Sequence, residues 1–344
     1  YKHSFDKIVM GINGSFGSDV FNYQPYSSNL NYSNETDRQH HTKAEIGVTL
    51  ASLDNSLPLN FTAEAGYRLF DRKYLSTWDY SPYTENTVYA HANMQGTINE
   101  EQHIGLKIDF DGFIYSDAQT PGDYLSVALN PYYIIEADEY KVCLGAHVDL
   151  ASNLDKKAVF APDIKLEYFF SDSYRLYLTA GGGRQLVDWR TLEAGSPYWS
   201  VINNMYDWSS INVPLDARLG FKASPINGLW FELFGGYSIR NDDLCFYGDI
   251  TSIDYRKTEF RFIDTKVLFG GINAQYAYKD LFSLSLKGTY YNWDVDREDE
   301  LALQLKPEFA LEGNLDVKVM KNLYVNLGYN FEVRKRVRDD LNDV

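Results

Sequence analysis

The chain has 344 residues, enough for two ordinary domains or for one large β architecture. Its formal net charge of −16 would repel phosphate groups, so no nucleic-acid partner is expected. Aromatic residues, which favour strands, make up 16% of the chain. No stretch approaches the roughly 18 consecutive apolar residues of a membrane helix, which leaves a membrane barrel open, because only alternate residues of its strands face lipid.

The domain organisation predicted from these features is simple. The sequence has no Pro- or Ser-rich linker and no shift in composition, so we expect residues 1–344 to form one domain. It starts without a signal peptide, and any targeting segment has been removed or lies outside this sequence. Cys143 and Cys245 are too few for a disulfide framework or a zinc knuckle.

Polar and apolar residues alternate along most of the chain, and a period of two predicts strands. Many of these strands are about twice as long as the five or six residues usual in globular proteins, and long enough to cross a membrane at a tilt. The predicted strands are 7–22, 39–52, 58–71, 86–98, 102–116, 123–136, 140–151, 160–170, 174–186, 209–223, 228–241, 258–278, 281–293, 300–319 and 322–336. The segment 190–208 could hold one short helical turn.

The predicted connections alternate between short and long. Short turns lie near 53–57, 99–101, 137–139, 171–173, 224–227, 279–280 and 320–321. Long loops include 23–38, 72–85, 187–208 and 242–257. This alternation is typical of an outer-membrane barrel, with short periplasmic turns and long extracellular loops. The predicted fold is therefore all-β, an antiparallel transmembrane β-barrel with about 14–16 strands.

The two faces of each strand differ in the way this fold requires. In residues 59–69, Leu59, Phe61 and Tyr67 alternate with Glu64 and Arg68. The apolar stripe would contact the lipid bilayer and the charged stripe would enclose water. Tyrosines beside the short turns would form an interfacial belt, because their rings are apolar and their hydroxyls are hydrated.

The strand count has a consequence for closure. Fifteen predicted strands are an odd number, whereas bacterial single-chain barrels usually have an even one. We therefore expect that at least one closing strand is lacking and that the chain is part of a longer barrel.

Three stretches, NFTAEAGYRLFDRKY (60–74), LSLKGTYYNWDVD (284–296) and NLYVNLGYNFEVRKR (322–336), are long hairpin segments punctuated by Gly and Tyr. In this respect the chain resembles the barrel portion of TonB-dependent receptors of Gram-negative outer membranes. The resemblance implies solute uptake across the outer membrane and an energy-coupling partner. Members of this family also carry an N-terminal plug and a coupling box, and this sequence shows neither. Plugless porin-like barrels and assembly-type barrels follow the same physical rules.

The polar face supplies the candidate lumen residues. They are Lys43, Glu45, Glu64, Arg68, Lys107, Asp109, Lys165, Glu167, Arg175, Asp216, Arg218, Glu308 and Glu312. Neighbouring strands could pair these charges and brace the wall. The same charges could also line a polar conduit.

The long loops contain aromatic side chains that could stack on a sugar or peptide ligand. The candidates are Trp78, Tyr80, Tyr198, Trp199, Tyr206 and Trp208. The alternative is that these loops pack on themselves over the pore. Acidic segments at 241–243 and 294–300 lack the spacing of a defined calcium loop, so we expect solvated acidic loops and no metal site.

No catalytic residues or cofactors are predicted. His91, His103 and His147 fall on the polar face, but no Gly-x-Ser-x-Gly elbow accompanies them. The function favoured by the sequence is uptake or passage of a polar solute that the extracellular loops select. The alternative is a non-conducting structural or assembly barrel that docks a surface lipoprotein or another partner, and an outer-membrane hydrolase is the weaker third candidate.

Overall fold

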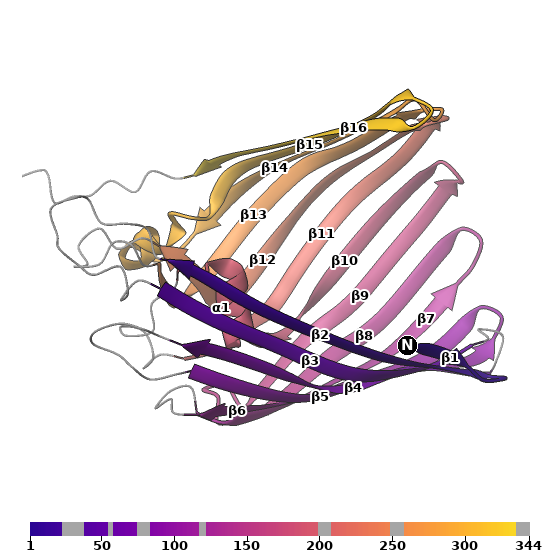
Figure 1. Cartoon of the computed structure of the whole chain (residues 1–344). Helices are drawn as coiled ribbons and strands as arrows, with labels where there is room; N and C mark the ends of the chain where they lie inside the picture. Colours follow the sequence, from indigo (N-terminus) through magenta and orange to yellow (C-terminus); the bar gives the residue numbers. More distant parts are fainter. Residues whose placement is uncertain are drawn as a thin grey trace, which may run out of the picture.

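The computed structural model describes residues 1–22, 38–53, 58–73, 83–116, 122–198, 208–247 and 258–334. Within these ranges one antiparallel sheet contains 16 strands, and each strand pairs with its neighbours in sequence (Figure 1). The predicted all-β fold class is confirmed. None of the helices in these ranges is long and apolar enough to cross a membrane.

The strands are long throughout most of the sheet. Their bounds are β1 (Lys2–Ser4), β2 (Ile8–Asn22), β3 (Arg38–Ser52), β4 (Leu59–Lys73), β5 (Tyr83–Asn99), β6 (Gln102–Ser116), β7 (Tyr124–Glu136), β8 (Tyr140–Ser152), β9 (Ala158–Ser171), β10 (Tyr174–Gln185), β11 (Ile211–Ile226), β12 (Leu229–Tyr247), β13 (Glu259–Tyr278), β14 (Phe282–Asp294), β15 (Pro307–Met320) and β16 (Leu323–Arg334). Two helical segments accompany them in the described part of the chain, α1 (Trp189–Gly195) and the 3-10 helix η3 (Arg297–Leu303).

The fifteen predicted strands correspond to β2–β16, and three details differ most from the prediction. The strand β12 continues to Tyr247, six residues beyond the predicted end at 241 and into the predicted loop 242–257. The three-residue strand β1 is too short to show a period of two, and it was missed. The predicted strand 300–319 begins too early, because residues 297–303 form η3 and β15 starts at Pro307. In η3 the side chains of Ala302 and Leu303 are both buried, so the two neighbours do not alternate between faces as strand residues do.

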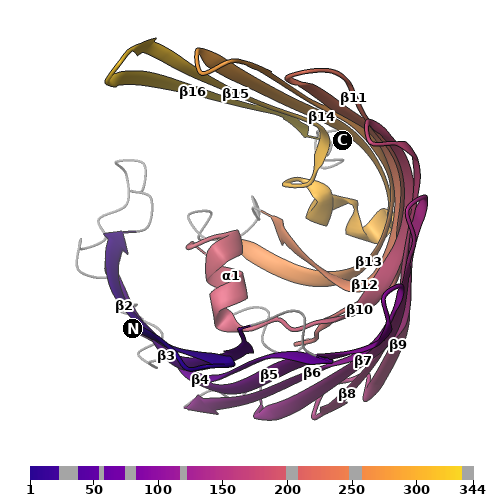
Figure 2. The same cartoon turned by 90° about the vertical axis from the view of Figure 1, so that its right-hand side faces the viewer.

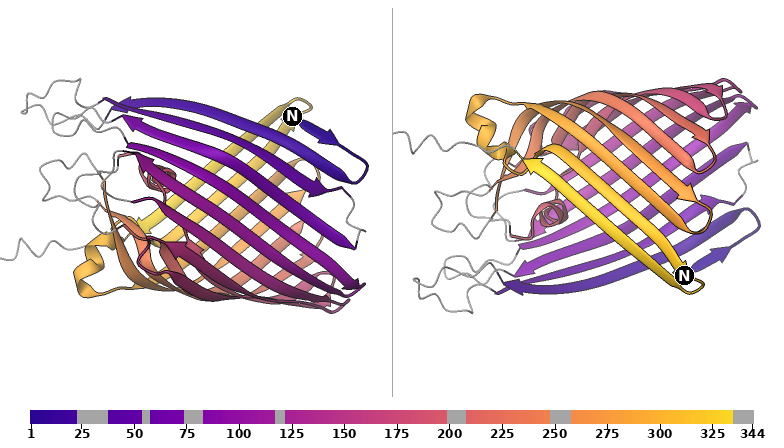
Figure 3. Two further views of the ribbon diagram at one scale, coloured as in Figure 1. Left: turned by 90° about the horizontal axis from the view of Figure 1, so that it is seen from below. Right: turned by 90° about the horizontal axis from the view of Figure 1, so that it is seen from above.

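The sheet curls around an interior, and α1 and η3 lie inside the curl (Figure 2). The strands are tilted, so those on opposite sides of the curl cross when seen from above or below (Figure 3). Tilt of this kind is what closing a sheet into a barrel requires. Within the described residues, β16 pairs with β15 alone and is not joined to β1 or β2.

The outer face of the sheet is apolar. Along β13, Leu268 and Ile272 are 57% and 48% exposed, whereas Val267, the residue before Leu268, is 5% exposed. Beside the short turns this face carries exposed Tyr140, Tyr168, Phe170 and Tyr174. Aromatic rings at that level form the interfacial belt of a membrane barrel. The chain thus has the surface of a protein that spans a bilayer with strands.

Candidate functional site

The inner face of the sheet is identified by its contacts with α1. The Arg190 guanidinium of α1 lies 3.4 Å from a carboxylate oxygen of Glu45 on β3. Paired residues of antiparallel strands share a face, so the register carries this inner face from strand to strand. Glu45 is paired with Arg68, for example, and His91 is paired with both Glu64 and Asp109.

The register places twelve of the thirteen candidate lumen residues on this inner face. They are Lys43, Glu45, Glu64, Arg68, Lys107, Asp109, Lys165, Glu167, Arg175, Asp216, Arg218 and Glu312. The remaining candidate, Glu308, lies where the register of β15 shifts between Pro307 and Phe309.

Many of these charges are paired with an opposite charge on the wall. Arg68 lies 3.3 Å from Glu45, Lys107 lies 3.0 Å from Asp109, and Arg175 lies 3.6 Å from Glu167. Lys287 on β14 lies 3.0 Å from Glu312 on β15. The pairs Arg68–Glu45, Arg175–Glu167 and Lys287–Glu312 join neighbouring strands and brace them, whereas Lys107 and Asp109 are both on β6. All these side chains present charge of both signs to the interior.

Two compact clusters on this face were not identified from the sequence. In the first, the Tyr89 hydroxyl donates to Glu45 and Glu64 at 3.2 and 3.1 Å, and the Arg68 guanidinium lies 4.1 Å from the ring centroid. In the second, the Tyr177 hydroxyl donates to Glu232, while Arg218 donates to both of them.

Each of these tyrosine rings lies over a glycine of the neighbouring strand. A Cβ added to Gly66 would meet the Tyr89 hydroxyl at 2.5 Å, and one added to Gly220 would meet the Tyr177 ring at 2.4 Å. The signal that could have revealed both clusters is a Gly and a Tyr opposite each other on the charged face. That signal requires the strand register, which the sequence does not supply.

The described part of the β10–β11 connection, residues 186–198, lies in the interior at the end of the sheet that carries the long loops (Figures 1 and 2). Trp189 and Leu192 of α1 are 1% and 0% exposed. They belong to a hydrophobic cluster inside the curl. The other buried members are Phe70, Phe113, Tyr115, Tyr124, Leu154, Val187, Ile211, Val213, Leu244 and Phe260.

Polar contacts attach α1 to the wall formed by β3–β5. One Arg190 nitrogen donates to the carbonyl oxygens of Ala44 and Leu69, at 2.9 and 3.1 Å. Glu193 lies 2.7 Å from the buried His41 ring. The Trp189 backbone N–H donates to Glu85 at 2.8 Å. The helix is therefore held in a defined position, its seat, by contacts with both buried rings and charged groups.

The β14–β15 connection also turns inward. Lys306 lies 2.9 Å from Asp243 on β12, and Arg261 on β13 lies 3.3 Å from Asp299 of η3. Ala302 packs with a second buried cluster that includes Cys245 and Tyr247. The long-loop end of the interior is thus occupied from two sides by the chain's own connections.

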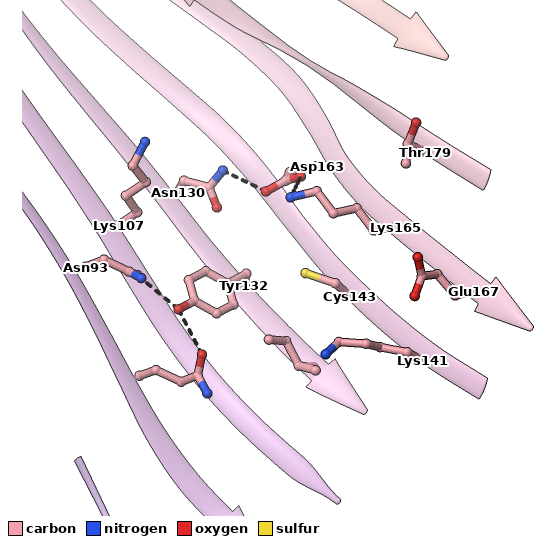
Figure 4. Close-up of a pocket in the computed structure, with 12 residues that line it drawn as sticks. Asn93, Lys107, Asn130, Tyr132, Lys141, Cys143, Asp163, Lys165, Glu167 and Thr179 are labelled. Atoms are coloured by element: carbon pink, nitrogen blue, oxygen red, sulfur yellow. Dashed lines mark hydrogen bonds and ion pairs between the residues drawn. The ribbon is translucent and has the colours of Figure 1, made fainter. Parts of the chain in front are cut away.

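A polar recess lies on the inner wall toward the short-turn ends of β5–β10 (Figure 4). Its volume is about 470 Å³. The lining residues are Asn93, Gln95, Lys107, Asn130, Tyr132, Ile134, Lys141, Cys143, Asp163, Lys165, Glu167 and Thr179. Tyr132 donates to Asn93 at 3.0 Å, and Lys165 lies 3.4 Å from Asp163. Amides, ammonium groups and carboxylates together offer donors and acceptors to a polar solute.

The candidate loop aromatics divide into two groups. Trp78, Tyr80, Trp199 and Tyr206 lie outside the described residues. Tyr198 packs edge-to-face against Phe21, with ring centroids 5.7 Å apart. The ring centroid of Trp208 lies 6.2 to 6.4 Å from those of Tyr115, Phe260 and Phe262. For these two residues the contacts are those of the loop-packing alternative.

The acidic segment 241–243 was expected to be a solvated loop, and this is wrong, because it lies within β12 and Asp243 is 1% exposed. Basic side chains of the protein itself contact its carboxylates. Asp242 lies 3.2 Å from Lys156, and Asp243 contacts both Lys306 and Arg240. Among the described residues, no group of three or more His, Cys, Asp or Glu side chains is arranged so that it could hold a metal ion.

The three histidines on the charged face are all hydrogen-bonded to wall residues. His91 lies 3.2 Å from Asp111, His103 lies 3.2 Å from Thr97, and His147 lies 2.8 Å from Asn130.

Comparisons with known proteins give no match in sequence and clear matches in structure. No protein-family model matches the chain, and no curated protein matches it. The FrpB iron transporter from Neisseria meningitidis is similar with a TM-score of 0.65 and 9% identity, over 94% of this chain and 56% of that one.

Two further solved structures show the same fold. The siderophore receptor PirA from Pseudomonas aeruginosa gives a TM-score of 0.65 and 12% identity, over 95% of this chain and 61% of that one. The copper transporter OprC gives a TM-score of 0.59 and 14% identity, over 91% of this chain and 54% of that one. The chain therefore spans between roughly half and three fifths of the length of these proteins.

At these identities the likeness shows the fold. The chain has the fold of an outer-membrane β-barrel, and the resemblance to the barrel portion of TonB-dependent receptors is confirmed at that level. The comparison proteins are transporters and receptors, not enzymes. Together with the apolar outer face, this fold is that of a protein that spans a membrane with strands.

Proposed function

We propose that the chain forms the wall of an outer-membrane barrel that takes up a polar solute. The observation that carries this proposal is the contrast between the two faces of one sheet. Lipid-type residues cover the outer face, and a mixed-charge inner face contains a recess of about 470 Å³. The names of the similar structures, which concern iron, siderophores and copper, support small solutes as cargo.

The inner-face residues have different parts in this proposal. Lys107, Lys165 and Glu167 line the recess and would contact the solute on its way inward. Glu45, Arg68 and Arg218 belong to the braced clusters and would hold the wall in shape. Among the loop aromatics, Trp78, Tyr80, Trp199 and Tyr206 are the proposed outer ligand contacts. Tyr198 and Trp208 would support them from within the packed region.

The wall itself must be closed to enclose water. An unpaired strand edge in hydrocarbon would leave N–H and C=O groups without partners, at a cost of several kcal/mol each. We propose that the two edges of the sheet, at β1–β2 and at β16, pair with further strands of a longer barrel. The single-domain organisation and an energy-coupling partner belong to the same proposal.

Solute uptake by cells tests this function directly. Cells that carry or lack the protein are offered radiolabelled polar solutes, including a ferric siderophore, ionic copper, an oligosaccharide and a short peptide. We expect the protein to raise uptake of at least one of them. Replacing both Lys107 and Lys165 with Gln should lower that uptake, whereas Lys287→Gln, outside the recess, should not. Equal uptake with and without the protein, for every solute, would refute the proposal.

The second candidate is a non-conducting structural or assembly barrel. The observation in its favour is the packed hydrophobic region that α1 and η3 build inside the long-loop end. It predicts no uptake of any solute and stable co-purification of a surface lipoprotein from detergent-solubilised outer membranes.

A further inference from the structure

The position of α1 divides the interior into two parts. The long-loop end contains buried rings, whereas the short-turn half holds the polar recess. Figure 1 shows α1 at the end of the sheet that carries the long connections. A solute that enters from the cell exterior and reaches the recess must therefore pass α1.

The contacts of α1 indicate a fixed element rather than a loose one. Two of its side chains, Trp189 and Leu192, are almost fully removed from solvent. Arg190 contacts two strands at once, through the Glu45 carboxylate and the carbonyl oxygens of Ala44 and Leu69. A guanidinium that satisfies several acceptors in fixed geometry holds its neighbours in register.

The second anchor is on the next turn of the helix. Glu193 contacts His41 at 2.7 Å and lies 3.9 Å from Lys43, and its side chain is only 9% exposed. The two anchors are three residues apart and attach α1 to β3 and β4, whereas the chain that leads into the helix leaves the sheet at β10 (Figure 2). A segment that leaves β10 and is anchored on β3 and β4 narrows the interior between these strands.

We propose that residues 186–198 form a fixed strap that sets the size of the hydrophilic solutes able to reach the recess from outside. The strap selects by size. Its buried side chains pack against the wall, so the strap does not move and the opening beside it stays constant. Arg190 and Glu193 are its positioning residues. This inference rests on the proposed function only in taking the interior as the solute's route.

Cys143 provides a native reporter on the far side of the strap. It lines the recess three residues from the start of β8, at the short-turn end, whereas Cys245 is fully buried. Intact cells are treated from outside with two thiol reagents, a small methanethiosulfonate and a bulky polyethylene-glycol maleimide. In the native protein the small reagent should label Cys143 and the bulky one should label it slowly.

The test compares this labelling in Arg190→Gln, Glu193→Gln and the double variant. Loss of an anchor should speed bulky labelling by about tenfold, which corresponds to removing about 1.4 kcal/mol from the seated strap. Labelling by the small reagent should stay unchanged. Arg190→Lys should have an intermediate effect, since it keeps the charge but loses the fork of donors.

Arg334→Gln is the matched control, because it removes an exposed pair with Glu332 at the far edge of the sheet. Folding of every variant is checked by its heat-dependent gel mobility, and only folded protein is scored. The proposal is overturned if the bulky reagent labels native protein as fast as the small one, or if the folded variants match native protein. It is also overturned if even the small reagent fails, because another element would then close the interior. None of these results depends on which solute is taken up.

Discussion

The inner-face clusters show how single residues stiffen a wide wall. In both, a tyrosine lies across a glycine, an arginine stacks on an aromatic ring and a glutamate accepts the hydroxyl. A glycine in a strand gives up side-chain packing, and an aromatic ring laid over it restores that packing. The arginine adds a cation–π contact, and its charge is balanced by the glutamate. The first cluster links β3, β4 and β5, and the second links β10, β11 and β12.

Gly66→Ala should destabilise the sheet. The new Cβ would lie 2.5 Å from both the Tyr89 hydroxyl and the Ile46 carbonyl oxygen, and the carbonyl cannot swing away. Overpacking of this kind costs about 1–3 kcal/mol. The measurement is urea unfolding in lipid vesicles. Gly17→Ala is the control, since nothing lies within 4 Å of its added Cβ, and an equal loss in both variants would contradict the explanation.

Glu232→Ala and Glu312→Ala test whether buried and exposed charge pairs differ on this wall. Glu232 is 5% exposed and accepts from Tyr177 and Arg218, so its loss should lower the free energy of unfolding by about 1.5–3 kcal/mol. Glu312 forms an exposed pair with Lys287, and its loss should cost less than about 1 kcal/mol. The same unfolding assay measures both, and a larger effect at Glu312 would rule out the bracing role of Glu232.

At the scale of elements, alternation was enough to predict the strands and their faces. The period of two in β7 and β8 gives both the lipid-facing stripe and the position of Cys143 on the charged stripe. Elements whose existence depends on distant contacts were not predictable in the same way. The sequence allowed one helical turn in 190–208, but the seat of α1 depends on His41 and Glu45, far away along the chain.

The candidate site also has a part that the sequence predicts and a part that it does not. Membership of the charged face follows from counting residues along a strand, so the lumen candidates could be named. The Tyr89 and Tyr177 clusters require the register between strands. The recess requires six strands, β5–β10, to be brought together. Local patterns carry no information on either, because register and curvature are set by the whole sheet.

Charge placed on the outer face of β13 tests the membrane assignment of that element. Ile272 is 48% exposed on the apolar face, between Leu268 and the aromatic level at Tyr276. Ile272→Arg should cost about 2–4 kcal/mol in a bilayer, because a guanidinium near the midplane must be moved into hydrocarbon. The neighbouring residue Asn273 faces the interior, so Asn273→Arg should change the free energy of unfolding by no more than about 0.5 kcal/mol. Unfolding from vesicles measures both, and equal costs would show that Ile272 does not face lipid.

At the scale of the whole molecule, one curved sheet separates three environments. Its outer face suits lipid, the long-loop half of its interior is packed with rings, and the short-turn half is polar. The charged residues of the candidate lumen set lie on the inner face, away from lipid, where they do not oppose insertion. What remains open is the edge of the sheet, since every residue of β16 is exposed.

Amide hydrogen exchange tests how that edge is completed. In this 344-residue chain solubilised in detergent, β16 pairs on one side only, so about half of its amides should exchange fast, while those of β14 stay protected. In the protein as it occurs in its outer membrane, a further strand on β16 should protect the remaining amides to the level of β14, because hydrocarbon offers no substitute partner. The strand β8, paired on both sides in either preparation, serves as the internal reference. If β16 amides exchange equally fast in both preparations, its edge is free in the membrane too, and the closed, water-filled barrel proposed for this chain is wrong.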